Sequence, residues 1–459
     1  MCGIIGIFSP TPSNNIQYSV FEGLFSLQHR GQDSFGIASD SYIVKHNGLV
    51  KNLSDHSELS KLNSNMCIGH VRYATNGVLN DIQPYYNLFP SRITLCHNGN
   101  ITNIKKLQSI LKTNFNVDYV SDSDSEYILT LFCIKLYQYI RSNQSSIDSK
   151  SVTEVCNYLQ ETLEGSFCII ILIQNYGMVV VRDKLGIRPL IYGKKHEQYI
   201  VSSESCALSL LNFEIIRDVK AGETIIFKNG NDSPIFHQYS NSNLTPCLFE
   251  YLYFSRPDSI LDNVSVYNAR IDIGKLMGYK LKKLFNCNEI DYIIPVPDTS
   301  MTFCIGIQEV INKPIREGFI KNKYVDRTFI MKDNQVIAKN VRRKLTANEI
   351  IFRDKVVLIL DDSIVRGNTS RHIIKTARNC GAKKIYFGSC SPVVKNTNQY
   401  GIYIPTKEEL VSYNRNEEKI REEIGVDHLI YNDLEDIKKI IKSYNPTIYD
   451  FETSMFRGM

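Results

Sequence analysis

Short apolar runs separated by polar turns dominate the first half of the chain. The runs are rich in β-branched residues, as strands usually are, and they cover residues 4–8, 67–71, 93–96, 166–173, 178–183 and 199–202. Two further stretches, residues 19–28 and 125–140, repeat apolar side chains at helical spacing. Asp122, Ser123 and Asp124 precede the second stretch as candidate N-terminal caps. This half is therefore predicted to have a mixed α+β fold.

A polar stretch at residues 228–246, with many Asn and Ser and two Pro, separates this half from the rest of the chain. Such a composition indicates a domain boundary, so two domains are predicted, at residues 1–240 and 241–459. Beyond the boundary, apolar strands alternate with helices, a pattern typical of βαβ units with a parallel sheet. The predicted strands are residues 292–296, 356–360 and 384–388; helices start near Thr302 and Thr369, and residues 407–443 are charged with helical spacing.

The length of 459 residues also suits two domains. Apolar residues make up 43% and charged residues 22%, which is ordinary for a soluble globular protein. The net charge of +5 is small, and the densest basic run, Arg342-Arg343-Lys344, does not predict nucleic-acid binding. No apolar run reaches the ~18 residues of a membrane span, and the N-terminus lacks a secretory pattern. A cytoplasmic protein is expected, or a protein of an organelle matrix if its precursor is longer.

The twelve cysteines are scattered along the chain, and none forms a C-x-x-C pair. Most stand in apolar surroundings, so they are expected to be reduced and buried. The nine histidines are equally scattered, which argues against a zinc site.

Cys2 differs from the other cysteines because removal of Met1 would make it the N-terminal residue. A free N-terminal cysteine holds a thiol with a pKa of ~8.5 beside an amine with a pKa of ~7.7–8.0. The amine can therefore accept the thiol proton near neutral pH, and no separate histidine base is needed. The alternative is that Cys2 merely begins a strand.

Four further residues fit the attack of Cys2 on a glutamine amide. The guanidinium of Arg72 can clamp an α-carboxylate, and Asp124 can pair with an α-ammonium. Asn98 and Gly99 can supply one side-chain and one backbone N–H to an oxyanion. The structural alternatives are a helix N-cap for Asp124 and an ordinary Asn-Gly turn.

Through Asp124 the chain resembles the glutaminase domain of class II amidotransferases, in which the nucleophile is N-terminal. Residues 28–34 (Gln-His-Arg-Gly-Gln-Asp-Ser) are also similar to an early loop of that family. The resemblance implies a fold of two β-sheets sandwiched between helical layers. It also implies that Cys2 is the nucleophile, that Asn98 and Gly99 form the oxyanion hole, and that Arg72, Thr75 and Asp124 hold glutamine.

In the second half, an apolar strand runs into the sequence Asp-Asp-Ser-Ile-Val-Arg-Gly-Asn-Thr-Ser at residues 361–370, followed by a helix. Adjacent carboxylates at the end of a strand suit ribose hydroxyls or Mg²⁺. The turn and the helix N-terminus after it favour a phosphate, at the edge where open α/β sheets bind ligands. A Walker-B strand would require a G-x-x-x-x-G-K-[ST] loop, which is missing. The structural alternative is a strand that ends in an acidic turn.

This segment resembles the phosphoribosyl diphosphate (PRPP) loop of type I phosphoribosyltransferases, except that Asn368 replaces the usual Thr. The resemblance implies Mg²⁺ ligation by Thr299, Asp361 and Asp362. It implies charge neutralisation on the diphosphate by Lys321 and Arg327, which lie in or beside a loop expected to close over PRPP. The implied PRPP contacts are Asp361, Asp362, Ser363, Val365, Arg366, Gly367, Asn368, Thr369, Ser370, Lys321 and Arg327.

The two halves together resemble the amidophosphoribosyltransferase family, whose signature matches residues 247–259. The implied reaction converts glutamine, PRPP and water into 5-phosphoribosylamine, glutamate and diphosphate, the first committed step of purine synthesis. Ammonia would pass between the sites along a path that includes Tyr253 and Ile330. Asn398 stands where iron–sulfur relatives carry a cysteine, so Cys247 alone is not expected to hold a cluster. Family analogy adds feedback by purine nucleotides and a homotetramer.

Two other functions would share parts of this pattern. One alternative is another class II amidotransferase. An asparagine synthetase would need an S-G-G-x-D-S loop, which does not occur in the chain. A glucosamine-phosphate synthase would need sugar-isomerase repeats, and the PRPP loop argues against them. A PRPP-sensing binding protein with a dead active site would not need Cys2, Arg72, Asn98, Asp124, Asp361 and Asp362 together. Release of diphosphate from PRPP and glutamine would separate an enzyme from a binding protein.

Overall fold

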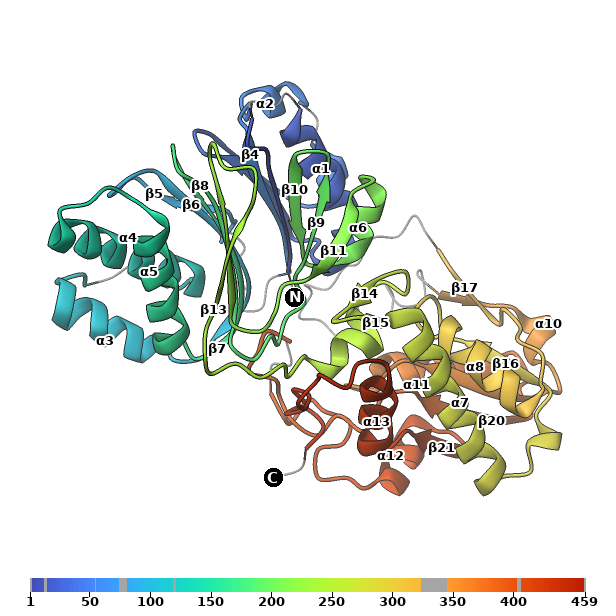
Figure 1. Ribbon diagram of the computed structural model, residues 1–459. Helices are drawn as coiled ribbons and strands as arrows, with labels where there is room; N and C mark the ends of the chain where they lie inside the picture. The colour runs from blue at the N-terminus through green and yellow to red at the C-terminus, as the bar shows by residue number, and fades with distance from the viewer. Residues whose placement is uncertain are drawn as a thin grey trace.

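The computed structural model describes residues 2–11, 15–53, 55–73, 81–118, 121–322, 345–402 and 406–457. Two bodies follow one another along the chain (Figure 1). The first, called here the sandwich half, contains every strand from β1 to β13 (Ile235–Gln238). The second, the parallel-sheet half, starts near Cys247.

Two antiparallel sheets form the centre of the sandwich half. The seven-stranded sheet has the order β11-β9-β10-β1-β4-β2-β3, and the six-stranded sheet has the order β13-β12-β8-β7-β6-β5. The strands of the first are β1 (Gly3–Phe8), β2 (Ser34–Ser39), β3 (Ile43–Asn47), β4 (Met66–Arg72), β9 (Ile191–Lys195), β10 (Gln198–Ser202) and β11 (Glu214–Asp218). Those of the second, besides β13, are β5 (Tyr85–Asn87), β6 (Ile93–Ile101), β7 (Gly165–Ile173), β8 (Gly177–Arg182) and β12 (Glu223–Lys228).

Helices cover the outer face of each sheet, so inner strands such as β1, β4 and β8 are buried on both sides. Along β1, Ile4 and Phe8 face the core between the sheets, whereas Ile5 and Ile7 face a helical layer, as the two-residue period of a strand requires. That layer contains α1 (Ile16–Ser26), α2 (Ser57–Ser60) and α6 (Ser205–Leu210). The other layer contains α3 (Ile104–Phe115), α4 (Asp124–Asn143) and α5 (Ser149–Thr162). The predicted sandwich between helical layers is confirmed.

A four-stranded parallel sheet with the order β16-β19-β20-β21 forms the centre of the second half. Its strands are β16 (Tyr292–Pro295), β19 (Val356–Asp361), β20 (Lys384–Ser389) and β21 (His428–Tyr431). One face packs on α7 (Val266–Leu284), α8 (Met301–Ile311) and α13 (Leu434–Tyr444). The other packs on α11 (Asn368–Asn379) and α12 (Glu417–Ile424). This doubly covered sheet confirms the predicted α/β class.

Short elements complete the described chain: β14 (Ile260–Leu261), β15 (Val264–Ser265), β17 (Phe319–Lys321), β18 (Leu345–Ala347), α10 (Glu349–Phe352), and the single turns η1 (Gln28–Arg30), η2 (Val50–Asn52), η3 (Glu250–Phe254) and η4 (Cys287–Glu289). One prediction needs correction. Residues 407–443 are not helical throughout, because β21 lies between α12 and α13 and pairs with β20. No described helix is both long enough and apolar enough to cross a membrane.

Candidate active sites

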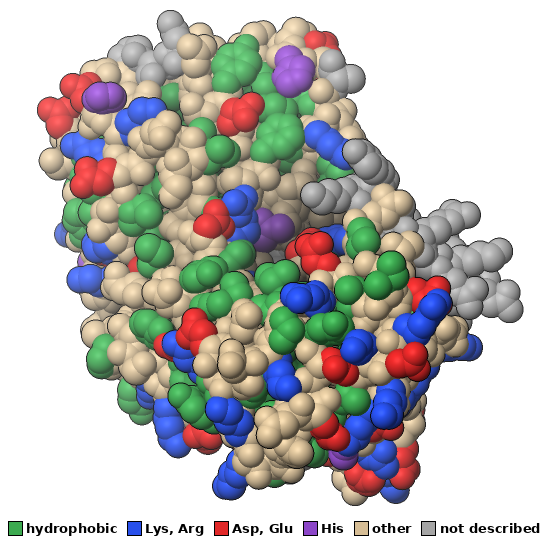
Figure 2. All heavy atoms as spheres, turned by 90° about the vertical axis from the view of Figure 1, so that its right-hand side faces the viewer, with side chains coloured by type: hydrophobic (Ala, Val, Ile, Leu, Met, Phe, Trp, Pro, Cys, Tyr) green, Lys and Arg blue, Asp and Glu red, His purple; other side chains and the backbone are tan. Residues whose placement is uncertain are grey.

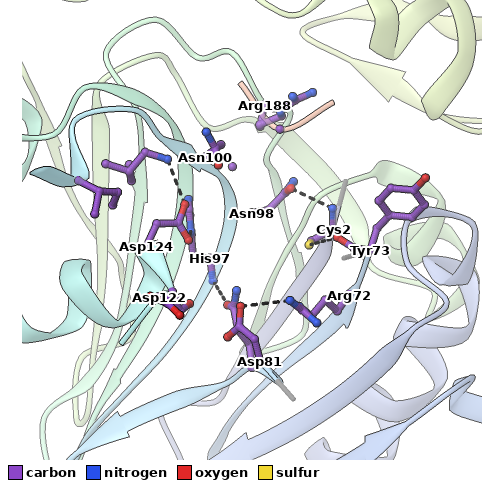
Figure 3. A pocket seen from close by; sticks show the side chains of 16 residues that line it. Cys2, Arg72, Tyr73, Asp81, His97, Asn98, Asn100, Asp122, Asp124 and Arg188 are labelled. Atoms are coloured by element: carbon purple, nitrogen blue, oxygen red, sulfur yellow. Dashed lines mark hydrogen bonds and ion pairs between the residues drawn. The ribbon is translucent and has the colours of Figure 1, made fainter. Parts of the chain in front are cut away.

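A pocket opens where the ends of β1, β4 and β6 meet the start of α4 (Figure 3). All five described residues predicted for the glutamine site line it: Cys2, Arg72, Asn98, Gly99 and Asp124. The other lining residues are Tyr73, Asp81, Gln83, His97, Asn100, Ile101, Ile104, Asp122, Ser123, Arg188 and Gly401. Thr75, the remaining predicted glutamine contact, lies outside the described residues.

Strand β6 explains how neighbouring residues serve opposite walls of this pocket. Successive side chains of a strand point to opposite faces. On β6, Cys96 lies in the core between the two sheets, whereas Leu95 lies in the core beneath the helices. Asn98 follows Cys96 on the face toward β1 and Cys2, while His97 follows Leu95 toward α4 and Asp124. A single strand thereby supplies both a partner for Cys2 and a partner for Asp124.

The Cys2 environment contains a buried donor that is suited to an oxyanion. The Cys2 backbone N lies 3.3 Å from the Asn98 Oδ1, which accepts its hydrogen bond. This orientation leaves the buried Asn98 Nδ2 without a hydrogen-bond partner among the described residues. Since an unpaired buried donor is costly, its presence beside the Cys2 thiol points to a ligand atom that it binds. The next residue is a glycine because a Cβ at Gly99 would lie 1.9 Å from the Ser166 carbonyl oxygen.

Arg72 ends β4 with its side chain almost fully buried in the pocket wall. Its Nη2 lies 3.2 Å from the Asp81 Oδ2. Sequence reasoning missed Asp81, because it belongs to no recognisable motif. A guanidinium carries its N–H donors in a planar fork, which matches the two oxygens of a carboxylate.

Asp124 is held at the N-terminus of α4 from two sides. Its Oδ2 accepts a hydrogen bond of 3.0 Å from the backbone N–H of Ile101, and its Oδ1 lies 3.6 Å from the His97 Nδ1. Burial alone would raise the pKa of Asp124, but the charge of His97 and these hydrogen bonds outweigh it and keep that pKa below its usual value. The carboxylate therefore stays ionised and can receive an ammonium group.

The parallel-sheet half also contributes to this pocket. Gly401 lines it, and a Cβ there would lie 3.3 Å from the Gly99 carbonyl oxygen. The same loop is tied to the sandwich half, because its Tyr400 carbonyl accepts from the Arg188 Nε at 3.1 Å and from the Ser166 hydroxyl at 3.0 Å. Figure 2 shows the face on the right of Figure 1, which is hollowed between the two halves where charged side chains and histidine gather.

A second site lies at the carboxyl edge of the parallel sheet. Strands β16 and β19 pair in parallel, so their ends bring Thr299 and Asp361 to one edge. Asp361 and Asp362 are both more than nine-tenths buried. Burial, with the neighbouring charge of Asp362, raises the pKa of Asp361 well above its usual value. Such a carboxylate pair is destabilised by mutual repulsion, and a bound cation would relieve that repulsion.

The loop after Asp362 has the geometry of an anion site. The Ser363 hydroxyl donates to the Asp362 Oδ1 at 2.7 Å, and Gly367, with φ 73°, turns the chain into α11 at Asn368. A left-handed φ of this kind favours glycine, and the first N–H groups of a helix attract phosphate. The loop and the start of α11 contain the remaining predicted PRPP contacts: Val365, Arg366, Thr369 and Ser370.

Lys321 ends β17 beside this edge, where its Nζ forms an ion pair with Asp298, the residue before Thr299. Arg366 pairs instead with Glu409 at 2.9 Å, and both side chains are exposed. Two predicted residues, Arg327 of the diphosphate site and Ile330 of the ammonia path, lie outside the described residues. The structure therefore brings Thr299, Asp361, Asp362 and Lys321 to one edge of the sheet.

Tyr253, the other predicted residue of the ammonia path, belongs to η3 at the start of the parallel-sheet half. Its ring lies 5.5 Å from that of Phe249 and 5.3 Å from that of Phe254. Nearby, Cys247 is buried and pairs with Glu452, whose carboxylate accepts from the Asn398 amide at 3.0 Å. An amide and a carboxylate thus stand beside the lone Cys247, and that donor set does not suit an iron–sulfur cluster.

Comparisons with known proteins identify the family of the chain. Residues 70–210 match the family model described as "Glutamine amidotransferase domain". Curated relatives named "Amidophosphoribosyltransferase" include those of Escherichia coli, at 41% identity over the whole chain and 92% of the relative, and Saccharomyces cerevisiae, at 37% identity with the same coverage.

Solved structures give the same result. The glutamine PRPP amidotransferase from B. subtilis, complexed with ADP and GMP, superposes with a TM-score of 0.85 at 32% identity, covering 100% of this chain and 97% of that one. A structure described as the allosteric regulatory enzyme of purine biosynthesis gives 0.83 at 32% identity, covering 96% and 91%.

The fold and the two sites define an enzyme that joins a glutamine amidotransferase to a phosphoribosyltransferase. Identity above 40% over the full chain makes the assignment specific. The chain belongs to the amidophosphoribosyltransferase family. The predicted activity is confirmed: the enzyme converts glutamine, PRPP and water into 5-phosphoribosylamine, glutamate and diphosphate.

Proposed function

We propose that glutamine is hydrolysed at Cys2 and that its ammonia reacts with PRPP at the Asp361–Asp362 edge. The observation that carries this proposal is the Asn98 Nδ2 beside Cys2, which is buried and has no hydrogen-bond partner in the described part of the chain. After removal of Met1, the α-amine of Cys2 takes the thiol proton, and the thiolate attacks the amide carbon of glutamine. The Asn98 Nδ2 and the Gly99 N–H stabilise the tetrahedral oxyanion that forms.

The α-groups of glutamine bind on the opposite wall. The α-carboxylate pairs with Arg72, and the α-ammonium pairs with Asp124, whose low pKa keeps it charged. Thr75 completes this set. Recognition of both α-groups holds the side-chain amide against Cys2, so that proximity lowers the barrier.

PRPP binds in the loop at residues 361–370, with its 5-phosphate at the N-terminus of α11. Asp361, Asp362 and Thr299 offer the oxygen ligands that Mg²⁺ requires, and the buried acid pair fits such a cation. When bound, Mg²⁺ makes diphosphate a better leaving group. Lys321 and Arg327 neutralise the departing charge. Asn368 donates its amide where hydroxyl donors are usual, and Arg371 fixes that amide through its oxygen.

The two sites belong to separate domains of the chain. Residues 1–240 form the glutaminase domain and residues 241–459 the phosphoribosyltransferase domain, with Tyr253 and Ile330 along the ammonia path between them. ADP and GMP, found with the B. subtilis relative, suggest purine nucleotides as feedback inhibitors. The working form is a homo-oligomer, with a tetramer expected, and the enzyme acts in the cytoplasm.

Asp361→Asn tests the second site. Loss of one carboxylate from the acid pair should lower diphosphate release from PRPP more than about tenfold, with glutamine or with ammonia as nitrogen donor. Asp354→Asn is the matched control, because Asp354 is exposed, precedes the same strand and has φ 58°, which asparagine tolerates. An unchanged rate in Asp361→Asn would remove Asp361 from the PRPP site.

A further inference from the structure

A buried cluster of charges connects the backbone of Cys2 to the parallel-sheet half. The Arg30 Nε donates to the Cys2 carbonyl oxygen at 3.0 Å. Its Nη1 pairs with Glu204, and its Nη2 pairs with the Glu250 Oε1 at 2.8 Å. All three side chains of this cluster are at most 2% exposed. One guanidinium thus contacts the candidate nucleophile and a carboxylate from each half of the molecule.

Each of the two carboxylates contacts residues of the other half of the molecule. Glu204 comes from the sandwich half, yet its Oε2 accepts from the Arg256 N–H at 3.0 Å and from the Ser259 hydroxyl at 2.7 Å. Glu250 comes from the parallel-sheet half and reaches back to Arg30. Such reciprocal contacts fix the two halves against each other at the level of Cys2.

The element that carries Glu250 is itself held firmly. The Ser255 hydroxyl donates to the Glu250 Oε2 at 3.0 Å, and the Arg188 Nη1 lies 3.3 Å from the Oε1. The buried Arg270 donates to the carbonyls of Tyr251 and Ser255, each at 2.8 Å. Every polar atom of the Glu250 carboxylate is therefore engaged, and the turn η3 has little freedom to move.

We propose that Glu250 is a positioning residue for Cys2, acting through Arg30, so that the parallel-sheet half completes the glutaminase site. The inference rests on the proposed role of Cys2 as nucleophile. It goes further by assigning part of the glutaminase geometry to a residue outside the glutaminase fold.

Loss of the Glu250 charge is expected to change the position of Cys2 through Arg30. A buried guanidinium needs its carboxylates, and removal of one leaves charge uncompensated, so Arg30 must shift toward its remaining partners. Arg30 holds the carbonyl of Cys2, and a shift there moves the thiol relative to the Asn98 amide. Displacement of a reacting group by about 1 Å can cost about 100-fold in rate. The groups proposed to hold glutamine are not in this cluster, so substrate affinity is expected to survive.

Glu250→Gln tests the proposal, because it removes the charge and keeps the shape. We expect kcat with glutamine to fall about tenfold or more, with KM for glutamine changed less than about twofold and the ammonia-driven rate retained. Alkylation of the Cys2 thiol by iodoacetamide, followed on the Cys2 peptide, should slow in parallel. Ser255→Ala, which keeps the carboxylate but removes one of its bonds, should give a smaller loss of the same rate alone.

Glu223→Gln is the matched control, since Glu223 is also buried and paired bidentately, with Arg217 at 2.7 Å for both bonds, but lies away from the pocket. It should leave the ratio of glutamine-driven to ammonia-driven rates unchanged.

The proposal is overturned if Glu250→Gln retains the glutamine-driven rate, or if both rates fall by the same factor, as a purely structural role requires. If Glu250→Gln does not fold, an unchanged rate ratio in Ser255→Ala overturns it. Cys2→Ser, assayed in parallel, separates the role of Glu250 from the role of Cys2. If Cys2→Ser still uses glutamine, the assignment of Cys2 as nucleophile is wrong.

Discussion

His97 and Asp124 both line the pocket beside Cys2, and each shifts the pKa of the other. Burial alone would lower the pKa of His97, but Asp124 outweighs it, so the pKa of His97 is raised above its usual value. The pKa of Asp124 is lowered in turn by the charge of His97. Between these two pKa values both groups are charged, and the carboxylate is ready for the ammonium of glutamine. In the proposed site, Asp124 therefore sets the acidic limb of glutamine use.

His97→Gln should move that acidic limb. Without the imidazolium, burial dominates and the pKa of Asp124 rises, so kcat/KM for glutamine should begin to fall at a higher pH than in the unmodified enzyme. The measurement is the pH profile of kcat/KM for glutamine, with the ammonia-driven reaction as internal reference. His46→Gln is the control, because His46 also pairs with a carboxylate, Glu58 at 3.1 Å, but does not line the pocket. An acidic limb at the same pH in His97→Gln would contradict this account.

The sequence identified the residues whose chemistry is unusual at their own position, such as Cys2 and the pair of aspartates. It could not identify residues that matter only through distant partners. Arg30 and Glu250 are separated by 220 positions, and Arg30 and Glu204 by 174. No local pattern predicts such pairs, because only the assembled topology brings them together. His97 was visible in the motif with Asn98, but its role depends on which face of β6 it occupies.

Strand β6 lies inside the six-stranded sheet, and its close approach to β7 leaves no room for a side chain at Gly99. The Ser166 carbonyl would stand 1.9 Å from an added Cβ. Gly99→Ala should therefore push β6 away from β7 at the oxyanion donor. We expect the free energy of unfolding to fall by about 1–3 kcal/mol and the glutamine-driven rate to fall more than about tenfold, while the ammonia-driven rate is retained.

Gly388→Ala provides the comparison for stability. Gly388 also lies in an internal strand, β20, but the nearest atom to an added Cβ is the Leu360 Cγ at an ordinary 3.5 Å. Its urea unfolding midpoint should stay close to that of the unmodified enzyme. Equal midpoints for the two glycine variants would show that β6 accommodates the added methyl group without loss of stability, which would contradict the close packing of β6 against β7.

Elements with a strong local pattern were predicted well. The long β-branched runs became β1, β4, β7, β8, β10 and β19. The amphipathic helix α7 was overlooked, although its buried Ile273, Met277 and Leu281 recur every four residues. Strand β21 was hidden because four residues between two charged helices carry little periodic signal. The short edge strand β5 likewise offers three residues, of which none is fully buried.

The whole molecule places two reaction centres on separate folds and ties them together through buried contacts. Arg182 of the sandwich half forms hydrogen bonds of 2.7 and 3.0 Å to both carboxylate oxygens of Asp262, and both side chains are buried. Arg188 and the loop at Tyr400 add a second link beside the pocket. The sequence predicted the two folds, because each has its own signature, but it could not predict this junction.

Cys2→Ser is the most direct test of the central claim that one site makes ammonia from glutamine and the other uses it. The hydroxyl is a much poorer nucleophile than the thiolate, and the PRPP site is untouched. Formation of 5-phosphoribosylamine and diphosphate should be lost with glutamine and retained with ammonia. Glutamine-driven product at an undiminished rate, or loss of the ammonia-driven reaction in a folded variant, would contradict the account.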